Sequence, residues 1–364
     1  MDQRLRPALL LGMLLAACTG GAGGSTASER SAPPVPAAPA APPASAPAAR
    51  AAPAAPEPLA QTVTVAYPSI AGSFLPLWLA ADEGLFARYG LDVDITYIAS
   101  GTTSMQSLIA GDVQFVLTSA AEPVAAYAAG APVQIVLGWS PTPSAIFVVD
   151  PRITSPEQLR GETLGITRFG AQPHVAARLA LQKWGLDPET DVQYLQLGGT
   201  PQIVAAMQSG VVVGGALAPP TNVRARQLGF RELGDVGQMG VAYQGNGVVG
   251  LQPYVDGNPE VVRRLVRALL EGIKLSLTDD AAARATLARY TRLEDPELLD
   301  ETIAHYRPVT QRDGYPSPQG LQAIINDLAE TDPRARTLQP AQLVNLAALQ
   351  QVEAEGFLRQ LYGE

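Results

Sequence analysis

The chain has 364 residues, 47% of them hydrophobic and 16% charged, which is enough apolar material for a large core in two or three domains. The formal net charge of −9 argues against a nucleic-acid partner, which would require a basic patch. The single cysteine excludes an internal disulfide. Of the two histidines, His174 has no Cys, second His or paired acidic residue nearby, so we expect no metal or catalytic role for it.

The first sixty residues carry the features of an exported and anchored protein. Arg4 and Arg6 precede an apolar run over residues 8–17, which fits the core of a signal peptide. Residues 15–18, Leu-Ala-Ala-Cys, resemble the lipobox of bacterial lipoproteins, in which cleavage precedes the cysteine and the sulfur receives a diacylglycerol. We therefore expect a signal peptide over residues 1–17, a lipid anchor at Cys18 and a Pro/Ala-rich linker over residues 18–60.

Strands and helices alternate in the next part of the chain. Apolar runs and alternating patterns predict strands over residues 62–66, 91–98, 113–117, 133–137 and 145–149, with helices over residues 74–83, 105–110 and 124–129. Short, wholly apolar strands are typical of a parallel sheet covered by helices. The fold class is therefore α/β, and ligands bind such sheets at the carboxyl ends of the strands.

A second copy of this pattern follows about a hundred residues later. Residues 100–123 contain a Gly/Ser/Thr loop, a short helix, a glycine turn, an apolar strand and a polar loop, and residues 198–221 repeat that order. The repeat predicts two similar α/β lobes. We expect the first lobe to comprise residues 61–150 and 240–364, and the second lobe residues 151–239.

The rest of the chain returns to the first lobe and then becomes helical. Residues 241–255 are expected to contain the returning strand, and the later segments favour helix over residues 261–277, 281–290, 296–306, 319–330 and 340–362. We expect this tail to pack on the first lobe.

Several motifs over residues 62–330 resemble one family of bacterial proteins. The motifs are Pro-Leu-Trp-Leu-Ala-Ala-Asp-Glu-Gly-Leu-Phe at residues 76–86, Gly-Leu-Asp-Val at 90–93, Ala-Gly-Asp-Val at 110–113 and Ile-Thr-Ser-Pro-Glu-Gln-Leu-Arg-Gly at 153–161. They are similar to the substrate-binding proteins of ABC importers of the nitrate/taurine/sulfonate and thiamine-pyrimidine-precursor type. The resemblance implies a type II periplasmic-binding-protein fold, with two lobes, two crossover strands and closure on a small solute.

The chain departs from that family at two places in its second lobe. The residues after the glycine turn are Val211, Val212 and Val213, where the family often has an acidic residue, and Ala218 precedes the proline where the family often has Trp or Glu. The identity of the solute therefore cannot be transferred from a relative.

Candidate ligand-binding residues follow the predicted strands. Hydroxyl groups and helix N-terminal N–H groups at such junctions bind acceptors or anions, although capping of the helix explains the same residues. Arg168 suits a carboxylate or sulfonate, Glu122 suits a donor on a ligand ring, and loop aromatics suit a planar ligand or the interior of a lobe. The candidates are Tyr67, Ser69, Ser73, Ser100, Gly101, Thr102, Ser119, Glu122, Trp139, Arg168, Phe169, Gln172, Thr221, Asn222 and Tyr243.

The sequence and the resemblance together predict a monomeric, extracytoplasmic lipoprotein that delivers a solute to an ABC permease and its ATPase. We expect no catalytic residues, no metal and no cofactor, because the chain shows no nucleophile–base pair or metal cluster. The alternatives are a ligand-sensing lipoprotein and a binder of a sulfonate- or nitrate-type anion. With only Lys183, Lys274 and one loop arginine as candidate cations, we favour an organic, heteroaromatic or vitamin-like solute.

Overall fold

The computed structural model describes residues 57, 59 and 61–364. The expected signal peptide and Cys18 lie outside the described residues, and so does the linker apart from Glu57 and Leu59. In the part of the chain that is described, no helix combines the length and the apolarity needed to cross a membrane.

The first sheet contains five strands in the order β2-β1-β3-β10-β4. These are β1 (Thr62–Tyr67), β2 (Asp92–Tyr97), β3 (Phe115–Thr118), β4 (Val133–Gly138) and β10 (Gly247–Leu251). Strand β1 pairs in parallel with β2 and β3, whereas β10 is antiparallel to β3 and β4. All four strands expected here between residues 62 and 138 are present, and the returning strand forms within residues 241–255 as predicted.

The second sheet has the order β7-β6-β8-β5-β9. It is built from β5 (Ile146–Val149), β6 (Thr163–Ile166), β7 (Gln193–Gln196), β8 (Gly214–Leu217) and β9 (Arg231–Asp235). Here β6 pairs in parallel with β7 and β8, and β5 is antiparallel to β8 and β9. The two sheets therefore have the same arrangement. In the first sheet the antiparallel strand, β10, follows the second lobe in the chain, and in the second sheet the antiparallel strand, β5, precedes the other four strands. This confirms the duplicated α/β architecture.

One strand lies in a different sheet from the one expected. Residues 145–149 were assigned to the first lobe, but β5 pairs with the second sheet, with Ile146 opposite Leu217 and Asp235. All four residues of β5 are buried, which suits a strand at the interior of a sheet with both faces covered. The chain thus crosses between the sheets at residues 139–145 and again at residues 236–246.

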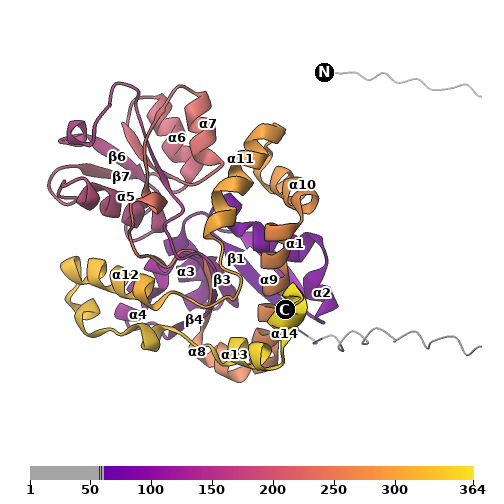
Figure 1. The fold of residues 1–364 in the computed structure, drawn as a ribbon. Helices are drawn as coiled ribbons and strands as arrows, with labels where there is room; N and C mark the ends of the chain where they lie inside the picture. Colours follow the sequence, from indigo (N-terminus) through magenta and orange to yellow (C-terminus); the bar gives the residue numbers. More distant parts are fainter. Residues whose placement is uncertain (1–56, 58, 60) are drawn as a thin grey trace, which may run out of the picture. The chain divides into compact units, whose positions relative to one another are not determined.

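Helices cover both faces of the first sheet. One face carries α1 (Leu75–Asp82) and α9 (Pro259–Thr278), and the other carries α3 (Gly101–Ala110), α4 (Ala121–Ala128) and α12 (Pro318–Thr331) (Figure 1). Successive side chains of each strand point to opposite faces of the sheet, because the strand is pleated. Within β3, for example, Phe115 and Leu117 belong to one apolar cluster and Val116 to the other.

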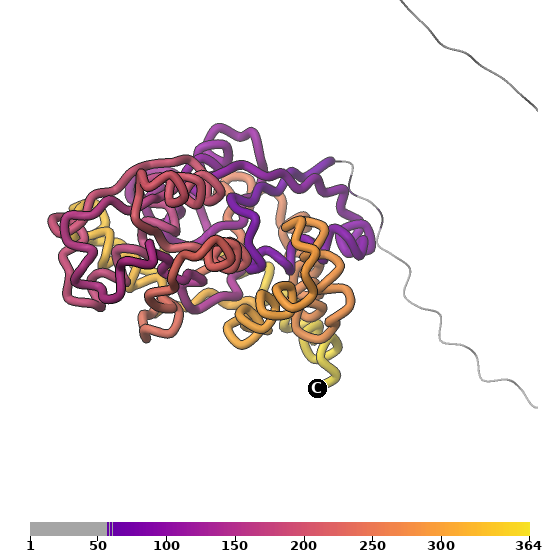
Figure 2. Tube along the Cα trace, turned by 90° about the horizontal axis from the view of Figure 1, so that it is seen from above, coloured from indigo at the N-terminus to yellow at the C-terminus, as the bar shows by residue number. Residues whose placement is uncertain are grey.

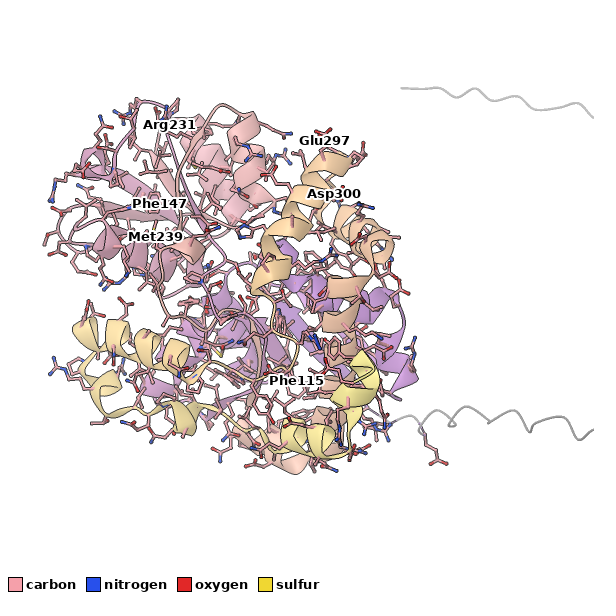
Figure 3. The ribbon with its side chains drawn as sticks, viewed as in Figure 1. Phe115, Phe147, Arg231, Met239, Glu297 and Asp300 are labelled. Atoms are coloured by element: carbon pink, nitrogen blue, oxygen red, sulfur yellow. The ribbon has the colours of Figure 1, made fainter. Side chains whose placement is uncertain are left out.

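The second sheet is covered in the same way. Helix α5 (Gln172–Lys183) packs on one face, and α6 (Thr200–Gln208) and α7 (Thr221–Gln227) pack on the other. Phe147 of β5 belongs to the cluster under α5, where Met239 packs against it (Figure 3).

The helical tail packs mainly on the first lobe. Helices α10 (Asp280–Thr291) and α11 (Pro296–Tyr306) lie beside the N-terminal segment of that lobe in both views (Figures 1 and 2). Residues 340–362, expected to favour helix throughout, form a 3₁₀ turn followed by α13 (Ala347–Ala354) and α14 (Phe357–Tyr362). The break between the last two helices occurs at Gly356, whose φ of 76° is left-handed.

Two short helices and six 3₁₀ turns complete the described fold. Helix α2 (Leu85–Arg88) and helix α8 (Gln252–Gly257) connect strands to longer helices, and 3₁₀ turns lie at Gly72–Phe74, Pro156–Leu159, Val236–Gln238, Arg307–Val309, Pro333–Thr337 and Pro340–Leu343. Both sheets and the tail belong to one compact unit of the chain.

Candidate functional site

A pocket lies where the carboxyl ends of parallel strands from both sheets meet the crossover segments. Its walls come from the loops after β1, β3 and β6, from the starts of α3, α5 and α6, and from both crossovers. The centre of a water-sized sphere can move through about 50 Å³ of it, so the pocket holds only a few water molecules in this arrangement. This is the position at which open α/β sheets bind ligands.

Eight of the fifteen predicted ligand-binding residues line this pocket. They are Ser69, Ser73, Ser100, Gly101, Ser119, Glu122, Gln172 and Tyr243. The first lobe, the second lobe and a crossover segment all contribute to this set, so folding brings together residues that are far apart in the sequence.

Four polar side chains of the lining are buried and lack a hydrogen-bond partner among the residues that the structure describes. They are the hydroxyl groups of Ser100, Thr118 and Thr167 and the amide nitrogen of Asn246. Buried polar groups are nearly always paired, because an unpaired one costs about 1–3 kcal/mol. Several such groups around one cavity indicate a site that a polar ligand completes.

The backbone of Ser100 is strained at the same place. Ser100 adopts a φ of 75°, and only one other non-glycine residue in the described part of the chain, Arg292, has a positive φ. A non-glycine residue in such a conformation costs about 1–3 kcal/mol and is maintained only where its surroundings impose it. Here it begins α3 with its hydroxyl at the pocket.

Glu122 links the two lobes across the pocket. Its Oε2 accepts a hydrogen bond from Ser119 Oγ at 2.6 Å, and its Oε1 accepts one from the backbone N–H of Gln172 at 3.0 Å. Ser119 in turn accepts a hydrogen bond from the hydroxyl of Tyr243 at 3.1 Å. Gln172 is the first residue of α5, so the carboxylate also lies at the positive end of that helix dipole.

Burial determines the protonation behaviour of this network. Desolvation raises the pKa of Glu122 above its usual range, although the hydrogen bonds from Ser119 and Gln172 partly oppose the rise. Desolvation raises the pKa of Tyr243 as well, with a further rise from the nearby Glu122. Tyr243 is therefore a neutral donor at physiological pH.

The glycine at position 101 is required by this carboxylate. A Cβ atom built on Gly101 would lie 2.1 Å from Glu122 Oε1 and 2.8 Å from Thr118 Oγ1. Any larger residue would push Glu122 away from α5, so the Ser-Gly-Thr loop predicted from the sequence has a steric reason.

Two of the predicted aromatic residues lie in the core instead of the pocket wall. Tyr67 packs against Phe74 and Trp78 in the largest apolar cluster. Trp139 is 1% exposed, and its indole N–H donates to the carbonyl of Ser73 at 3.3 Å. The sequence placed both in loops near strand ends, and such aromatics also fill the interior of a lobe.

The other five predicted residues lie outside the lining. Arg168 is exposed and Phe169 is 51% exposed, with the hydroxyl of Thr102 donating to the carbonyl of Phe169 at 3.4 Å. The amide nitrogen of Asn222 donates to Glu232 at 2.8 Å, and Thr221 begins α7. Thr102 and Phe169 are thus a contact between the lobes, whereas Asn222 connects α7 to β9.

Sequence reasoning did not select twelve residues of the lining. These are Pro68, Ala71, Phe74, Thr118, Ser144, Thr167, Pro173, Thr200, Ala216, Ala218, Gly245 and Asn246. The repeat contained a signal for Thr118, Thr167 and Thr200, because each one follows a predicted strand or opens a loop of the duplicated pattern. Ser144 and Asn246 lie on crossover segments, where no pattern in the sequence indicates their position.

The chemistry of the pocket is polar and nearly uncharged. Among the described residues that line it, none is Arg, Lys or His, and Glu122 is the one acidic residue. No group of three or more His, Cys, Asp or Glu suited to a metal occurs in the described range. The pocket can therefore bind a ligand through hydroxyl, amide and backbone groups.

Comparisons with known proteins agree with this architecture. The family model described as "NMT1/THI5 like" matches residues 71–283. The riboflavin-binding protein RibY of Chloroflexus aurantiacus is 30% identical over 231 residues, which cover 61% of this chain and 64% of that protein. The taurine-binding periplasmic protein of Escherichia coli is 29% identical over 218 residues, 58% of this chain and 65% of that protein. The match thus spans just under two thirds of each relative.

A solved structure shares the fold. The alkanesulfonate-binding protein SsuA from Xanthomonas axonopodis pv. citri, bound to MOPS, superposes with a TM-score of 0.68 and 22% identity, covering 80% of this chain and all of that one. At this identity the likeness concerns the fold, which is that of periplasmic binding proteins.

Proposed function

The chain belongs to the NMT1/THI5-like family, and from that premise we propose that it is the solute-binding component of an ABC importer. It captures a small organic solute outside the cytoplasm and presents it to a permease and its ATPase. The relatives named above bind riboflavin and taurine, and the taurine-binding one is periplasmic. Neither solute is transferred to this chain.

The observation that carries the proposal is the set of unpartnered polar groups around the pocket. Ser100, Thr118, Thr167 and Asn246 come from both lobes and a crossover segment, and a solute that bonds to them holds the two lobes together. Binding of the solute would therefore favour the closed arrangement of the lobes, as a clamshell mechanism requires.

The part of the solute inside the pocket is uncharged in this proposal. Anions are usually held by several donors that include Arg or Lys, and the described lining of the pocket has neither. The one acidic side chain of the lining, Glu122, offers no positive charge to an anion either. A neutral group with several hydrogen-bonding atoms, such as a hydroxylated or heteroaromatic fragment, fits these walls, which favours an organic solute over nitrate or sulfate.

The proposed cycle contains no chemical step. Both oxygens of Glu122 already accept hydrogen bonds, from Ser119 and from Gln172, so the carboxylate acts as a structural link between the lobes. The solute leaves unchanged when the lobes open at the permease.

The anchor is proposed from the sequence. Lipidation of Cys18 would keep the protein at the outer face of the cell membrane, with the Pro/Ala-rich linker as a spacer. Intact mass of the protein from its own host should show a lipid adduct and the loss of residues 1–17. Continued membrane fractionation of Cys18→Ala would contradict the anchor.

The experiment that tests the function starts from the natural solute. The protein is purified from its own host and denatured, and the released compound is identified by mass spectrometry. Calorimetry then compares wild type with Thr167→Val, which removes an unpartnered hydroxyl from the pocket at constant shape. We expect affinity to fall about tenfold, as for one lost hydrogen bond to a buried group.

Thr103→Val is the matched control. The hydroxyl of Thr103 is also buried and unpartnered among the described residues, but it does not line the pocket. Its loss should leave affinity unchanged. Equal effects of the two substitutions, or a protein that releases no compound, would count against the proposed site.

A further inference from the structure

A second, wider cavity opens beside the pocket, between the lobes. We call it the outer groove. One wall is formed by α6 and α7 of the second lobe, and the other by the end of β2 and the end of α10. The residues are Ile70, Tyr97, Thr200, Pro201, Val204, Ala205, Gln208, Pro220, Thr221, Arg224, Thr291, Arg292 and Leu293. About 410 Å³ admits the centre of a water-sized sphere, against about 50 Å³ in the pocket.

The outer groove adjoins the pocket. Thr200 lines both cavities, and Ile70 in the groove lies between Ser69 and Ala71, which line the pocket. A solute too large for 50 Å³ would reach the groove at this boundary. Most drug-sized ligands need several hundred cubic ångströms, which the two cavities supply together.

The groove carries positive charge, whereas the pocket is nearly uncharged. Its two charged residues, Arg224 and Arg292, are both exposed, and neither forms an ion pair or a side-chain hydrogen bond with a described residue. The neighbouring Arg226 differs, because it binds both carboxylate oxygens of Glu301 at 2.8 and 2.7 Å. Two arginines without a carboxylate partner on one groove suit an anionic group of a ligand.

Two side chains complete the description of the groove. Arg292 ends α10 in the left-handed conformation of a helix C-cap, with its backbone N–H donating to the carbonyl of Ala288 at 2.8 Å, and it lines the groove. Tyr97 is 40% exposed at the end of β2, and its ring provides a planar apolar surface in the same groove.

We propose that the outer groove is a second subsite for the same solute, and that it receives an acidic group, a phosphate, sulfonate or carboxylate, at the end opposite to the neutral part in the pocket. The inference rests on the proposed function and adds the chemical class: an organic acid with an uncharged, hydrogen-bonding end. Arg224 and Arg292 determine specificity for the acidic end.

Calorimetry with matched probes tests the subsite. Phenyl phosphate is compared with phenol, riboflavin 5′-phosphate with riboflavin, and inorganic phosphate is measured alone. The variants are Arg224→Gln/Arg292→Gln and the two single changes. The control is Arg231→Gln, since Arg231 is an exposed arginine at the start of β9, outside the groove (Figure 3).

We expect an organic phosphate to bind wild type more tightly than its uncharged partner. In the double variant, the ratio of the two affinities should fall at least about fivefold, which is the effect expected from losing two exposed ion pairs. In Arg231→Gln the ratio should not change. The preference should also fade at high salt, because exposed charges are screened.

Three results would overturn the subsite. The first is that neither organic phosphate shows saturable binding. The second is that the double variant keeps the preference for the phosphate. The third is that inorganic phosphate binds as tightly as phenyl phosphate, which would show an isolated ion site. If the double variant does not fold, the single variants decide the outcome. A natural solute that depends on Thr167 but has no acidic group would overturn the subsite and leave the proposed function intact.

Discussion

At the scale of single residues, the most informative group is the carboxylate of Glu122. It is 4% exposed, it forms no ion pair with a described residue, and it is held by one hydroxyl and one backbone N–H. An ionised carboxylate in such a place is costly unless its hydrogen bonds replace water. The structure thus places a titratable group on the contact that joins the lobes.

The first prediction follows from the raised pKa of Glu122. The folded protein holds this proton more tightly than the unfolded chain, so the contribution to stability is full below the unfolded pKa, near 4.3, and declines as the pH rises through the folded pKa. Glu122→Gln keeps an acceptor for Gln172 and removes the titration. The decline in unfolding free energy above pH 4.5 should be smaller in this variant by denaturant titration.

An exposed glutamate provides the control for this measurement. Glu83→Gln makes the same chemical change at an exposed position at the end of α1, away from the pocket, and its pH curve is measured alongside. Parallel curves for wild type and Glu122→Gln between pH 4.5 and 8 would show that Glu122 does not hold its proton as described.

The second prediction concerns His174, which titrates in the opposite direction. Burial, and then the neighbouring Arg178, lower the pKa of His174 to about 4. The neutral imidazole therefore contributes stability that is present above pH 6.5 and lost as the pH falls through about 4, by roughly 2–3 kcal/mol. Its Nδ1 accepts from the backbone N–H of Gly170 at 3.1 Å, and the ring packs on Tyr194.

His174→Asn tests this contribution by the slope of stability against pH. The asparagine keeps an acceptor for Gly170 but cannot become charged, so the loss of stability between pH 6.5 and 4 should be smaller than in wild type. Part of the slope should remain, because burial also lowers the pKa of His305. An unchanged slope would mean that His174 does not remain neutral in the folded protein.

At the scale of elements, the contact between α1 and α9 joins the tail to the first lobe. Gly272 lies at the centre of that contact, where an added Cβ would meet the carbonyl oxygen of Pro76 at 2.2 Å. The obstacle is backbone and not the end of a flexible side chain, so one of the helices has to move. The absence of a side chain at Gly272 therefore sets the distance between the two helices.

The third prediction uses this contact. Gly272→Ala should destabilise the protein by about 1–3 kcal/mol, the usual cost of overpacking, even though alanine is the better helix former. Gly257→Ala is the control, because nothing lies within 4 Å of its Cβ position and its φ is not positive. Thermal melting should separate the two, and equal melting temperatures would argue against close packing of α9 on α1.

The part of the fold that could be predicted from the sequence is the part that local periodicity determines. The strands and most helices follow from apolar runs and glycine stops, because these patterns depend on neighbouring residues. The sheet to which β5 belongs does not, since its residues Ile-Phe-Val-Val suit the interior of either sheet. The break at Gly356 was missed because glycine inside a helical pattern is only a weak signal.

The candidate site was predictable to a similar degree. Serines and glycines after strands were found because chain topology brings strand ends together, whatever the side chains. The direction of Tyr67 and Trp139 depends on which cavity each ring fills, and this is a property of packing between distant segments. Ser144 and Asn246 depend on the path of the crossovers, which has no local pattern.

At the scale of the whole described unit, the lobes are held in contact on several sides of the pocket. Arg178 of α5 donates to Asp327 of α12 at 3.3 Å, and Val175 and Leu179 of α5 belong to an apolar cluster of the first lobe. Arg226 binds Glu301 of α11 away from these contacts. With the Glu122–Gln172 bond inside the pocket, this arrangement corresponds to the closed state of a clamshell.

The last prediction weakens that closed state without touching the pocket. Glu301→Gln removes the charge that pairs with Arg226 across the lobes, so the open state should gain population and the apparent affinity for the solute should fall up to about fivefold. Asp300→Asn, one residue earlier on α11 (Figure 3), breaks the Arg284–Asp300 pair inside the tail and should leave affinity unchanged. Small-angle scattering should show a larger radius of gyration for ligand-free Glu301→Gln than for Asp300→Asn, and equal radii that contract equally with ligand would contradict a role for this ion pair in closure.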